Sequence, residues 1–243
     1  MNSSTVSDQI IPFQCYRGGV RDTEGPLSGR RREAARNDVE ILDAAREVFL
    51  AYPTAPVAAV AARANVGISA LYRRYASKEA LLRELARDGL IRYRAELERA
   101  LADDRDAWTV YSECLTRILD GGSQALAQRL AGTFTPTPEL TELAQEAGSL
   151  ATAVHRRAQR GQALRGDVSP EDVVLLLETL NSITLPGGDG GHSLRRRYLA
   201  LLLQALRAPG AQRLPGRPAS PAELAARWRE QTETGSVLPP EHP

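Results

Sequence analysis

The residues from Ile68 to Lys78 combine small side chains, hydroxyl groups and cations in a pattern that suits contact with nucleic acid. The segment reads I-S-A-L-Y-R-R-Y-A-S-K. Arginine can bridge guanine or a phosphate, hydroxyl groups reach base edges or phosphates, and small side chains allow close approach. We therefore expect a surface that contacts double-stranded DNA, made of Ile68, Ser69, Ala70, Tyr72, Arg73, Arg74, Tyr75 and Lys78.

Two short helices are predicted to present this surface. Apolar residues at the i, i+3, i+4, i+7 spacing form one stripe over residues 57–64. Asn65 tolerates the left-handed conformation that ends a helix, and Gly67 can be the N-cap of the next helix, over residues 68–75. Two helices joined by so tight a turn form a helix-turn-helix.

The second of these helices needs support, because isolated helices shorter than ~12 residues are marginal. Leu71 and Val66 are its expected inward anchors. A helix over about residues 36–51 should pack across the pair, and Pro56 suits the first position of the helix that follows. The expected apolar face of this first helix comprises Val39, Leu42, Ala44, Ala45, Val48 and Phe49.

The stretch A-N-V-G-I-S-A-L-Y-R-R-Y-A-S-K-E-A-L-L resembles the end of the DNA-binding domain in the tetracycline-repressor (TetR) family. That family's pattern runs approximately A-G-V-s-x-x-t-L-Y-x-h-F-x-s-K-e-x-L. The match includes Ala64, Val66, Leu71, Tyr72, Tyr75, Ser77, Lys78, Glu79 and Leu81. The resemblance implies an all-α protein with an N-terminal three-helix helix-turn-helix domain and a C-terminal helical domain that binds an effector and dimerises.

The residues and the resemblance together suggest a role for each side chain. Lys78 is the only lysine beside thirty arginines, and it stands at the family's phosphate-contacting position; the alternative is a surface lysine that contacts nothing. Pro53 and Pro56 depart from the family pattern, which has a glycine after the first helix and a capping Thr or Ser. We expect phosphate contacts from Tyr72, Tyr75 and Lys78, base-edge contacts from Ser69, Arg73 and Arg74, and thymine-methyl contacts from Ile68 and Ala70.

Composition and charge limit the other possibilities. The chain has 243 residues, 42% of them apolar, and only two cysteines, Cys15 and Cys114, which indicates a reducing compartment. No apolar run approaches the ~20 residues of a membrane span, and the N-terminus lacks the apolar core of a signal peptide, so we expect a cytoplasmic protein. Residues 30–94 carry thirteen Lys and Arg against eight Asp and Glu, although the net charge is only +1. This excess coincides with the helix-turn-helix, as expected of a polyanion-binding domain.

The predicted organisation has four parts. They are a disordered arm at residues 1–29, a DNA-binding domain at 30–80, an effector-binding and dimerisation domain at 81–210, and a tail at 211–243 with one short helix near Pro221–Arg229. The Arg30–Arg32 cluster could meet phosphates or the minor groove, or be a solvated charge run.

The second domain reads as helical throughout. A long helix from Ser77 to about Leu101 starts it, and the resemblance implies that this helix transmits ligand binding to DNA. Further helices are expected at residues 106–119, 122–132, 138–161, 169–184 and 193–207. The last two are apolar on more than one side, which predicts a homodimer through 169–184 and 193–207; the alternative is a fully buried central hairpin.

Aromatic and polar groups on otherwise aliphatic helices could line an effector pocket or be ordinary core. The candidates are Trp108, Tyr111, Cys114, Phe134 and His155. Their mostly apolar surroundings would suit an apolar or aromatic small molecule. The histidines and cysteines show no metal-ligand or catalytic spacing, so we expect no metal, no cofactor and no enzyme activity.

The sequence favours a transcriptional repressor that binds a palindromic operator as a homodimer and is released by a small-molecule effector. One rival is an all-helical enzyme or cofactor-binding protein whose helix-turn-helix is only structural. A second rival binds DNA without any effector.

Overall fold

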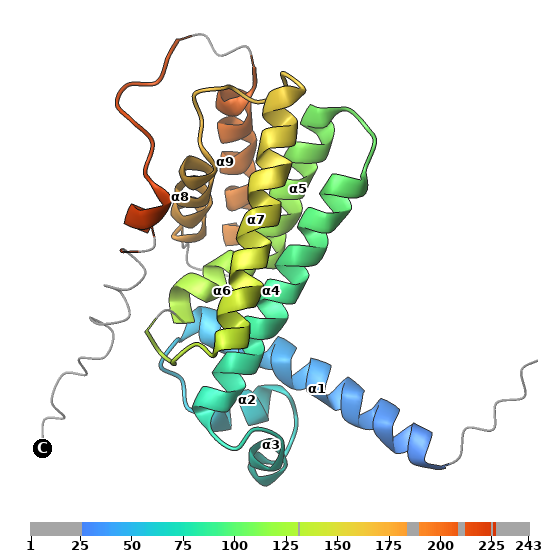
Figure 1. The fold of residues 1–243 in the computed structure, drawn as a ribbon. Helices are drawn as coiled ribbons and strands as arrows, with labels where there is room; N and C mark the ends of the chain where they lie inside the picture. The colour runs from blue at the N-terminus through green and yellow to red at the C-terminus, as the bar shows by residue number, and fades with distance from the viewer. Residues whose placement is uncertain (1–25, 131, 184–189, 209–211, 225, 227–243) are drawn as a thin grey trace, which may run out of the picture. The chain divides into compact units, whose positions relative to one another are not determined.

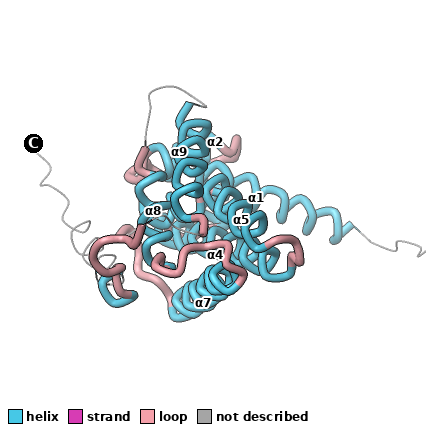
Figure 2. The backbone as a smooth tube through the Cα atoms, turned by 90° about the horizontal axis from the view of Figure 1, so that it is seen from above, coloured by secondary structure: helices cyan, strands magenta, loops and turns pink. Residues whose placement is uncertain are grey.

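The computed structural model describes residues 26–130, 132–183, 190–208, 212–224 and 226. Within them the predicted all-α fold is confirmed, with one isolated bridge between Leu164 and Arg207 (Figure 2). The elements are α1 (Pro26–Ala51), α2 (Val57–Arg63), α3 (Ile68–Arg74), α4 (Lys78–Ala102), α5 (Ala107–Gly121), α6 (Ser123–Leu130), α7 (Pro138–Arg160), α8 (Pro170–Asn181) and α9 (Gly190–Leu206). The chain divides into two compact units, Met1–Asp38 and Val39–Pro243, with the boundary inside α1.

Helix α1 begins at Pro26, well before the predicted start at about residue 36. Residues 26–29 are therefore helical, and the expectation of a disordered arm is wrong for them; residues 1–25 lie outside the described part of the chain. A proline is well tolerated in the first turn of a helix, and the arginine, glutamate and alanine residues that follow favour helix. Val39 was expected on the apolar face but is 52% exposed, whereas Ile41 is buried.

The turn between α2 and α3 closes as the sequence predicts. Asn65 has a φ of 54°. The Val66 amide donates to the Ala61 carbonyl at 3.0 Å, and the Asn65 amide donates to the Ala62 carbonyl at 3.2 Å. This pair of hydrogen bonds is a Schellman motif, in which a left-handed residue satisfies the last carbonyls of a helix. Gly67 is the N-cap of α3, as predicted.

One hydrophobic cluster supports the helix-turn-helix. It contains Ile41, Leu42, Ala44, Ala45, Phe49, Val57, Val60, Ala61, Leu71, Tyr75, Leu81, Leu82, Leu85, Leu126 and Leu130. Leu126 and Leu130 come from α6, so the core of the helix-turn-helix extends beyond α1–α4. The sequence did not predict this packing, because the i, i+4 spacing of Leu126 and Leu130 shows that they share one side of a helix but not which other helices that side contacts.

Helix α4 runs from the helix-turn-helix into the larger bundle, where it packs along α7 (Figure 1). Ser77 caps its start by accepting a hydrogen bond from the Ala80 amide at 3.1 Å, as predicted. At its other end, the Arg157 guanidinium from α7 donates to the carbonyls of Ala100 at 2.8 Å and Leu101 at 3.0 Å. Arg157 thus satisfies carbonyls that the helix leaves unpaired.

Charged side chains tie α1 to α4. Arg46 donates to Asp43 at 2.6 Å on its own helix and also pairs with Asp88 on α4. Arg92 donates to Asp88 at 2.9 Å and to Asp43 at 3.3 Å, which closes a ring of four charges. The ring joins the helix behind the helix-turn-helix to the first half of α4.

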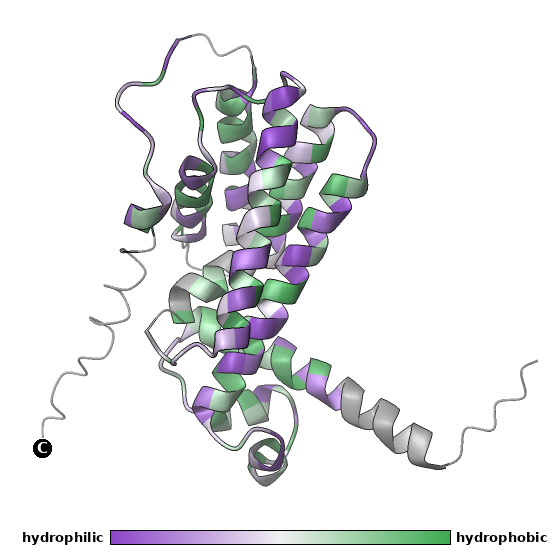
Figure 3. Cartoon of the chain, viewed as in Figure 1, coloured by the Kyte–Doolittle hydropathy of each residue, from purple (hydrophilic) through white to green (hydrophobic). Residues whose placement is uncertain are grey.

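A second hydrophobic cluster fills the bundle of α4, α5, α7, α8 and α9. Its helices start with side-chain caps at Asp106, Thr137 and Ser169, the last of which forms a capping box with Asp172. Figure 3 shows extensive apolar colouring on α8 and α9, in agreement with their sequence.

The predicted C-terminal helix is described only at its start. Residues 221–224 are helical, and residues 227–243, which include its predicted end and Trp228, lie outside the described part of the chain.

Candidate nucleic-acid interface

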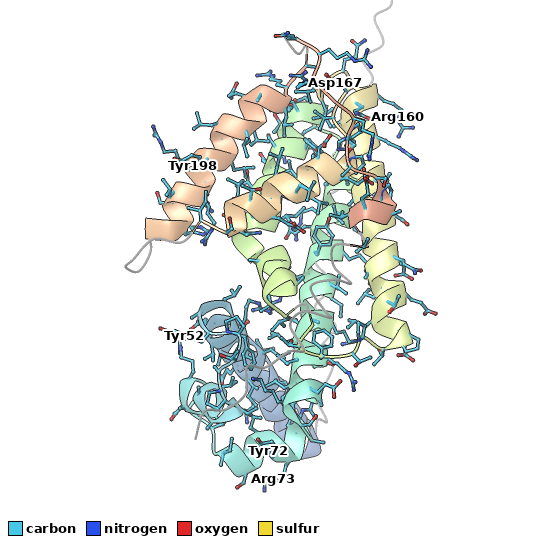
Figure 4. All side chains as sticks on the ribbon, turned by 90° about the vertical axis from the view of Figure 1, so that its left-hand side faces the viewer. Tyr52, Tyr72, Arg73, Arg160, Asp167 and Tyr198 are labelled. Atoms are coloured by element: carbon cyan, nitrogen blue, oxygen red, sulfur yellow. The ribbon has the colours of Figure 1, made fainter. Side chains whose placement is uncertain are left out.

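Helix α3 presents most of the predicted DNA-contacting residues to solvent. Ile68 is 40% and Tyr72 is 48% exposed, and Ser69, Arg73 and Arg74 are exposed beside them. Figure 4 shows Tyr72 and Arg73 at the same end of the 39–243 unit. Ala70 is half-buried. The predicted anchor Leu71 is fully buried, so the helix is held by its inner side while its polar side stays accessible.

Tyr75 does not share this outer face. Its side chain is only 8% exposed and belongs to the cluster that supports the helix-turn-helix. The expectation that it faces outward is therefore wrong. Tyr75 follows α3 as its C-cap, with an extended backbone at φ −122° and ψ 106°. Leaving the helical path there places its ring in that cluster rather than on the outer face.

Lys78 is half-buried at the first position of α4, and its ammonium group faces the connection between α1 and α2. It donates to the Ala55 carbonyl at 2.8 Å and to the Thr54 carbonyl at 3.3 Å. It also lies over the ring of Phe49, 5.4 Å from the centroid, which is a cation–π distance. Burial lowers the pKa of Lys78 from its usual value. Sequence reasoning placed Lys78 near this surface but missed all three intramolecular partners.

Three of the predicted effector-pocket residues meet in the core of the larger bundle. Tyr111, Cys114 and His155 are all buried. Because a carbonyl can only accept, Nε2 of His155 must carry the proton that it donates to the Val168 carbonyl at 3.0 Å. Nδ1 then accepts from the Tyr111 hydroxyl at 3.1 Å. Burial raises the pKa of the Cys114 thiol to about 11, which keeps it protonated.

The other two candidates lie elsewhere. Trp108 is half-buried at the edge of the same cluster, with the Arg207 guanidinium 5.5 Å from its ring centroid. Phe134 packs against the helix-turn-helix cluster, not beside Tyr111 and His155. The structure therefore does not bring Phe134 together with Tyr111, Cys114 and His155. Phe134 follows α6, whose Leu126 and Leu130 enter the same cluster.

Two hollows in the described surface lie away from the buried Tyr111–His155 pair. One, between α4 and α7, is lined mainly by charged residues, including Arg87, Arg94 and Glu142. The other is more apolar and lies beside the α1–α2 connection, lined by Val48, Tyr52, Pro56 and their neighbours.

The buried histidine should make stability depend on pH. Burial lowers the pKa of His155 below its usual 6.5. A group with a lowered pKa in the folded state takes up its proton more readily when unfolded, so the stability that it contributes is complete above pH 6.5 and is lost as the pH falls towards the folded pKa. We expect the free energy of unfolding, measured by urea denaturation, to fall between pH 7.5 and pH 5, by at most about 1.4 kcal/mol per pH unit.

The matched variant is His155→Gln, which cannot titrate in that range and should show a flatter profile. Carboxyl groups with lowered pKa values, such as Glu113 and Glu139, also lose their contribution to stability as the pH falls towards their usual 4.5. They are present in both proteins, so the difference between the two pH profiles isolates His155. Identical pH profiles for the two proteins would show that His155 is not the group responsible.

Among the described residues, no group of three His, Cys, Asp or Glu side chains is placed to hold a metal ion. The helices in that part of the chain also include none with the length and apolar character needed to cross a membrane.

Comparison with known proteins agrees with this geometry. The model of the bacterial regulatory proteins of the tetR family matches residues 41–85, which run from α1 through α2 and α3 into the first turns of α4. None of the curated proteins matches the chain.

Several solved structures share the fold. A TetR transcriptional regulator from Streptomyces coelicolor is 24% identical, with a TM-score of 0.52 over 71% of this chain and 99% of its own. The TetR-like regulator LfrR from Mycobacterium smegmatis, solved in complex with proflavine, is 24% identical, with a TM-score of 0.55 over 75% of this chain and 99% of its own. A gamma-butyrolactone receptor is 19% identical, with a TM-score of 0.51 over 83% of this chain and 97% of its own.

This chain has a helix-turn-helix with an exposed polar helix, joined by a long helix to an all-helical bundle, and the solved TetR transcriptional regulators share this fold. The match in the DNA-binding region names the family more closely. Residues 41–85 match the model of the bacterial regulatory proteins of the tetR family, and the chain has the fold of solved TetR transcriptional regulators.

Proposed function

We propose that this chain is a transcriptional repressor that binds a palindromic operator as a homodimer and is released by a small molecule. The observation that carries the proposal is the outer face of α3, where exposed hydroxyl, aromatic and arginine side chains stand on a helix anchored by the buried Leu71. A rigid helix with such a face can enter the major groove and read base edges.

We assign the side chains of α3 different tasks. Tyr72 contacts phosphates, while Ser69, Arg73 and Arg74 reach base edges. Ile68 and Ala70 approach a thymine methyl group. Tyr75 is left out of this proposed set because its ring serves the core. In a dimer, the two copies of α3 would enter successive major grooves about 34 Å apart.

The proposed homodimer forms through α8 and α9. Helix α9 turns Leu199, Leu203 and Leu206 into its own core, whereas Tyr198 is exposed and Leu201 is 59% exposed. Figure 4 shows Tyr198 on the outer side of α9. Tyr198, Leu201 and the exposed Ala205, with the half-buried Leu194, follow a 4-3-4 spacing and so line one side of the helix. An exposed apolar stripe of this kind is what a two-fold helical interface needs.

The effector site belongs to the bundle around Tyr111 and His155. Their buried hydrogen-bonded pair offers a polar contact inside an otherwise apolar cluster, the usual make-up of a small-molecule site. The TetR-like regulator solved with proflavine binds an aromatic molecule, which supports an apolar or aromatic effector here. The effector would release the dimer from DNA only as far as it binds more tightly to the conformation in which the two α3 helices are wrongly spaced for the operator.

The direct test is to select bound sequences from random duplex DNA with the purified protein. Fluorescence anisotropy on the selected sequence, repeated across a panel of apolar metabolites, then measures affinity and release. Recovery of a palindromic sequence and its release by a metabolite would support the proposal. The absence of any enriched sequence in dilute buffer would refute it.

The dimer can be tested with Leu201→Glu. Burying an unpaired carboxylate costs about 3–5 kcal/mol, so we expect the dimer dissociation constant to rise at least ~100-fold and operator binding to weaken with it. Analytical ultracentrifugation gives the dissociation constant. Ala144→Glu, at an exposed position on α7, adds the same charge and should change nothing. A Leu201→Glu protein that stays fully dimeric would exclude this side of α9 from the interface.

A further inference from the structure

Lys78 stands where three segments of the helix-turn-helix domain meet. Its backbone opens α4, its ammonium group donates to two carbonyls of the α1–α2 connection, and its charge lies over the Phe49 ring of α1. The connection spans residues 52–56. One side chain thus joins α1, the connection and α4, the segments that surround α2 and α3.

Backbone hydrogen bonds join the two ends of the connection to the flanking helices: the Tyr52 amide donates to the Val48 carbonyl at 2.8 Å, and the Ala59 amide donates to the Pro56 carbonyl at 3.0 Å. Pro56 is the N-cap of α2 and provides no side-chain hydrogen bond. Within the connection, the Ala55 amide donates to the Tyr52 carbonyl at 3.0 Å. The carbonyls of Thr54 and Ala55 accept from Lys78, so removing its ammonium group removes these donors from both.

The position of Lys78 is otherwise unfavourable for a cation. The first turn of a helix carries a partial positive charge, which favours anions and disfavours lysine. The two carbonyl oxygens and the ring face offset this, because both attract a positive charge. An ammonium group has three donors, so two are already engaged within the molecule.

We infer that Lys78 is a positioning residue for operator recognition, which holds the α1–α2 connection so that α2 presents α3 in the correct orientation. It does not act mainly as a phosphate contact. The inference rests on the proposed DNA binding and adds a role that acts through the connection. A phosphate contact would strengthen binding to every sequence, whereas a positioning residue affects mainly the sequence that requires correct placement of α3.

The test uses the full-length protein and its Lys78→Met variant. Methionine keeps an unbranched apolar stem over Phe49 but has neither charge nor donor. We expect affinity for the selected operator to fall about tenfold, while affinity for unrelated duplex DNA and the slope of log K against log salt stay unchanged. Arg160→Met is the matched control. It removes one positive charge from an exposed site on α7, far from α3 in Figure 4, and should alter neither quantity.

Two results would overturn the inference. One is an equal loss of affinity for operator and unrelated DNA, with the salt slope falling by about 0.9 per bound copy, which is the signature of a lost phosphate contact. The other is unchanged operator affinity. Because a loss of stability alone would lower the active fraction and not the selectivity of the remainder, the ratio of operator to unrelated binding is the deciding quantity.

Amide hydrogen exchange provides a second test, which needs no DNA. Lys78→Met should speed exchange at the Ala55 amide several-fold and leave amides in the middle of α7 unchanged. Unchanged exchange at Ala55 contradicts the inference even if the protein binds DNA. Faster exchange in a protein that selects no DNA would instead show that the local role is right and that the proposed function has failed.

Discussion

Replacing Phe49 by alanine is expected to lower the free energy of unfolding by about 3–5 kcal/mol. The ring is fully buried in the cluster that supports the helix-turn-helix, and the Lys78 ammonium lies over it. Truncation therefore leaves a cavity among the side chains that anchor α3 and also removes the aromatic face beneath Lys78. Urea denaturation of the variant and the parent protein gives the difference directly.

The control is Val39→Ala on the same helix. Val39 is 52% exposed, so its truncation should change stability by no more than about 0.5 kcal/mol. Phe49→Leu, which refills most of the space, should fall between the two. A Phe49→Ala protein as stable as the parent would mean that α1 does not pack on the helix-turn-helix as described.

Arg73→Ala is expected to abolish most of the preference for the operator over unrelated DNA. One bidentate contact to a base contributes about 1–3 kcal/mol of discrimination, and two copies act in the proposed dimer. The expected loss is then about 2–6 kcal/mol, which is roughly 30-fold at the lower limit. Anisotropy titrations with operator and unrelated duplexes at several salt concentrations measure both the affinity and the preference.

Arg160→Ala on α7 is the matched control, because it removes the same side chain from an exposed site far from α3 in Figure 4. It should leave the preference intact. An equal loss for both duplexes in Arg73→Ala would reassign Arg73 to a phosphate. No loss for either would place it outside the interface.

The likeness to solved regulators lies in the fold. At 24% identity and TM-scores of 0.52 and 0.55, the regulators from Streptomyces coelicolor and Mycobacterium smegmatis share the fold of this chain. In the proposed function, operator recognition would depend on individual side chains such as Arg73, and effector binding on the Tyr111–His155 pair.

Sequence patterns were sufficient where the deciding interactions are local. The turn at Asn65, the cap at Ser77 and the burial of Leu71 follow from backbone preference, from a hydrogen bond within one turn and from helical spacing. The same reasoning located the exposed face of α3. It failed at Tyr75, because the backbone leaves the helix there and the helical period no longer predicts direction.

The remaining features depend on residues far apart in the chain. Phe134 was expected beside Tyr111, but it packs with the helix-turn-helix because α6 turns its leucines towards α1 and α4. Lys78 was expected on phosphate, but the carbonyls of Thr54 and Ala55 lie within its reach. By itself, the sequence determined the helices, the α2–α3 turn and the resemblance of residues 41–85 to the tetR family, since each is encoded within a few neighbouring residues. Only the tertiary structure decided which groups face Lys78, Tyr75 and Phe134, since those contacts arise when separate helices pack together.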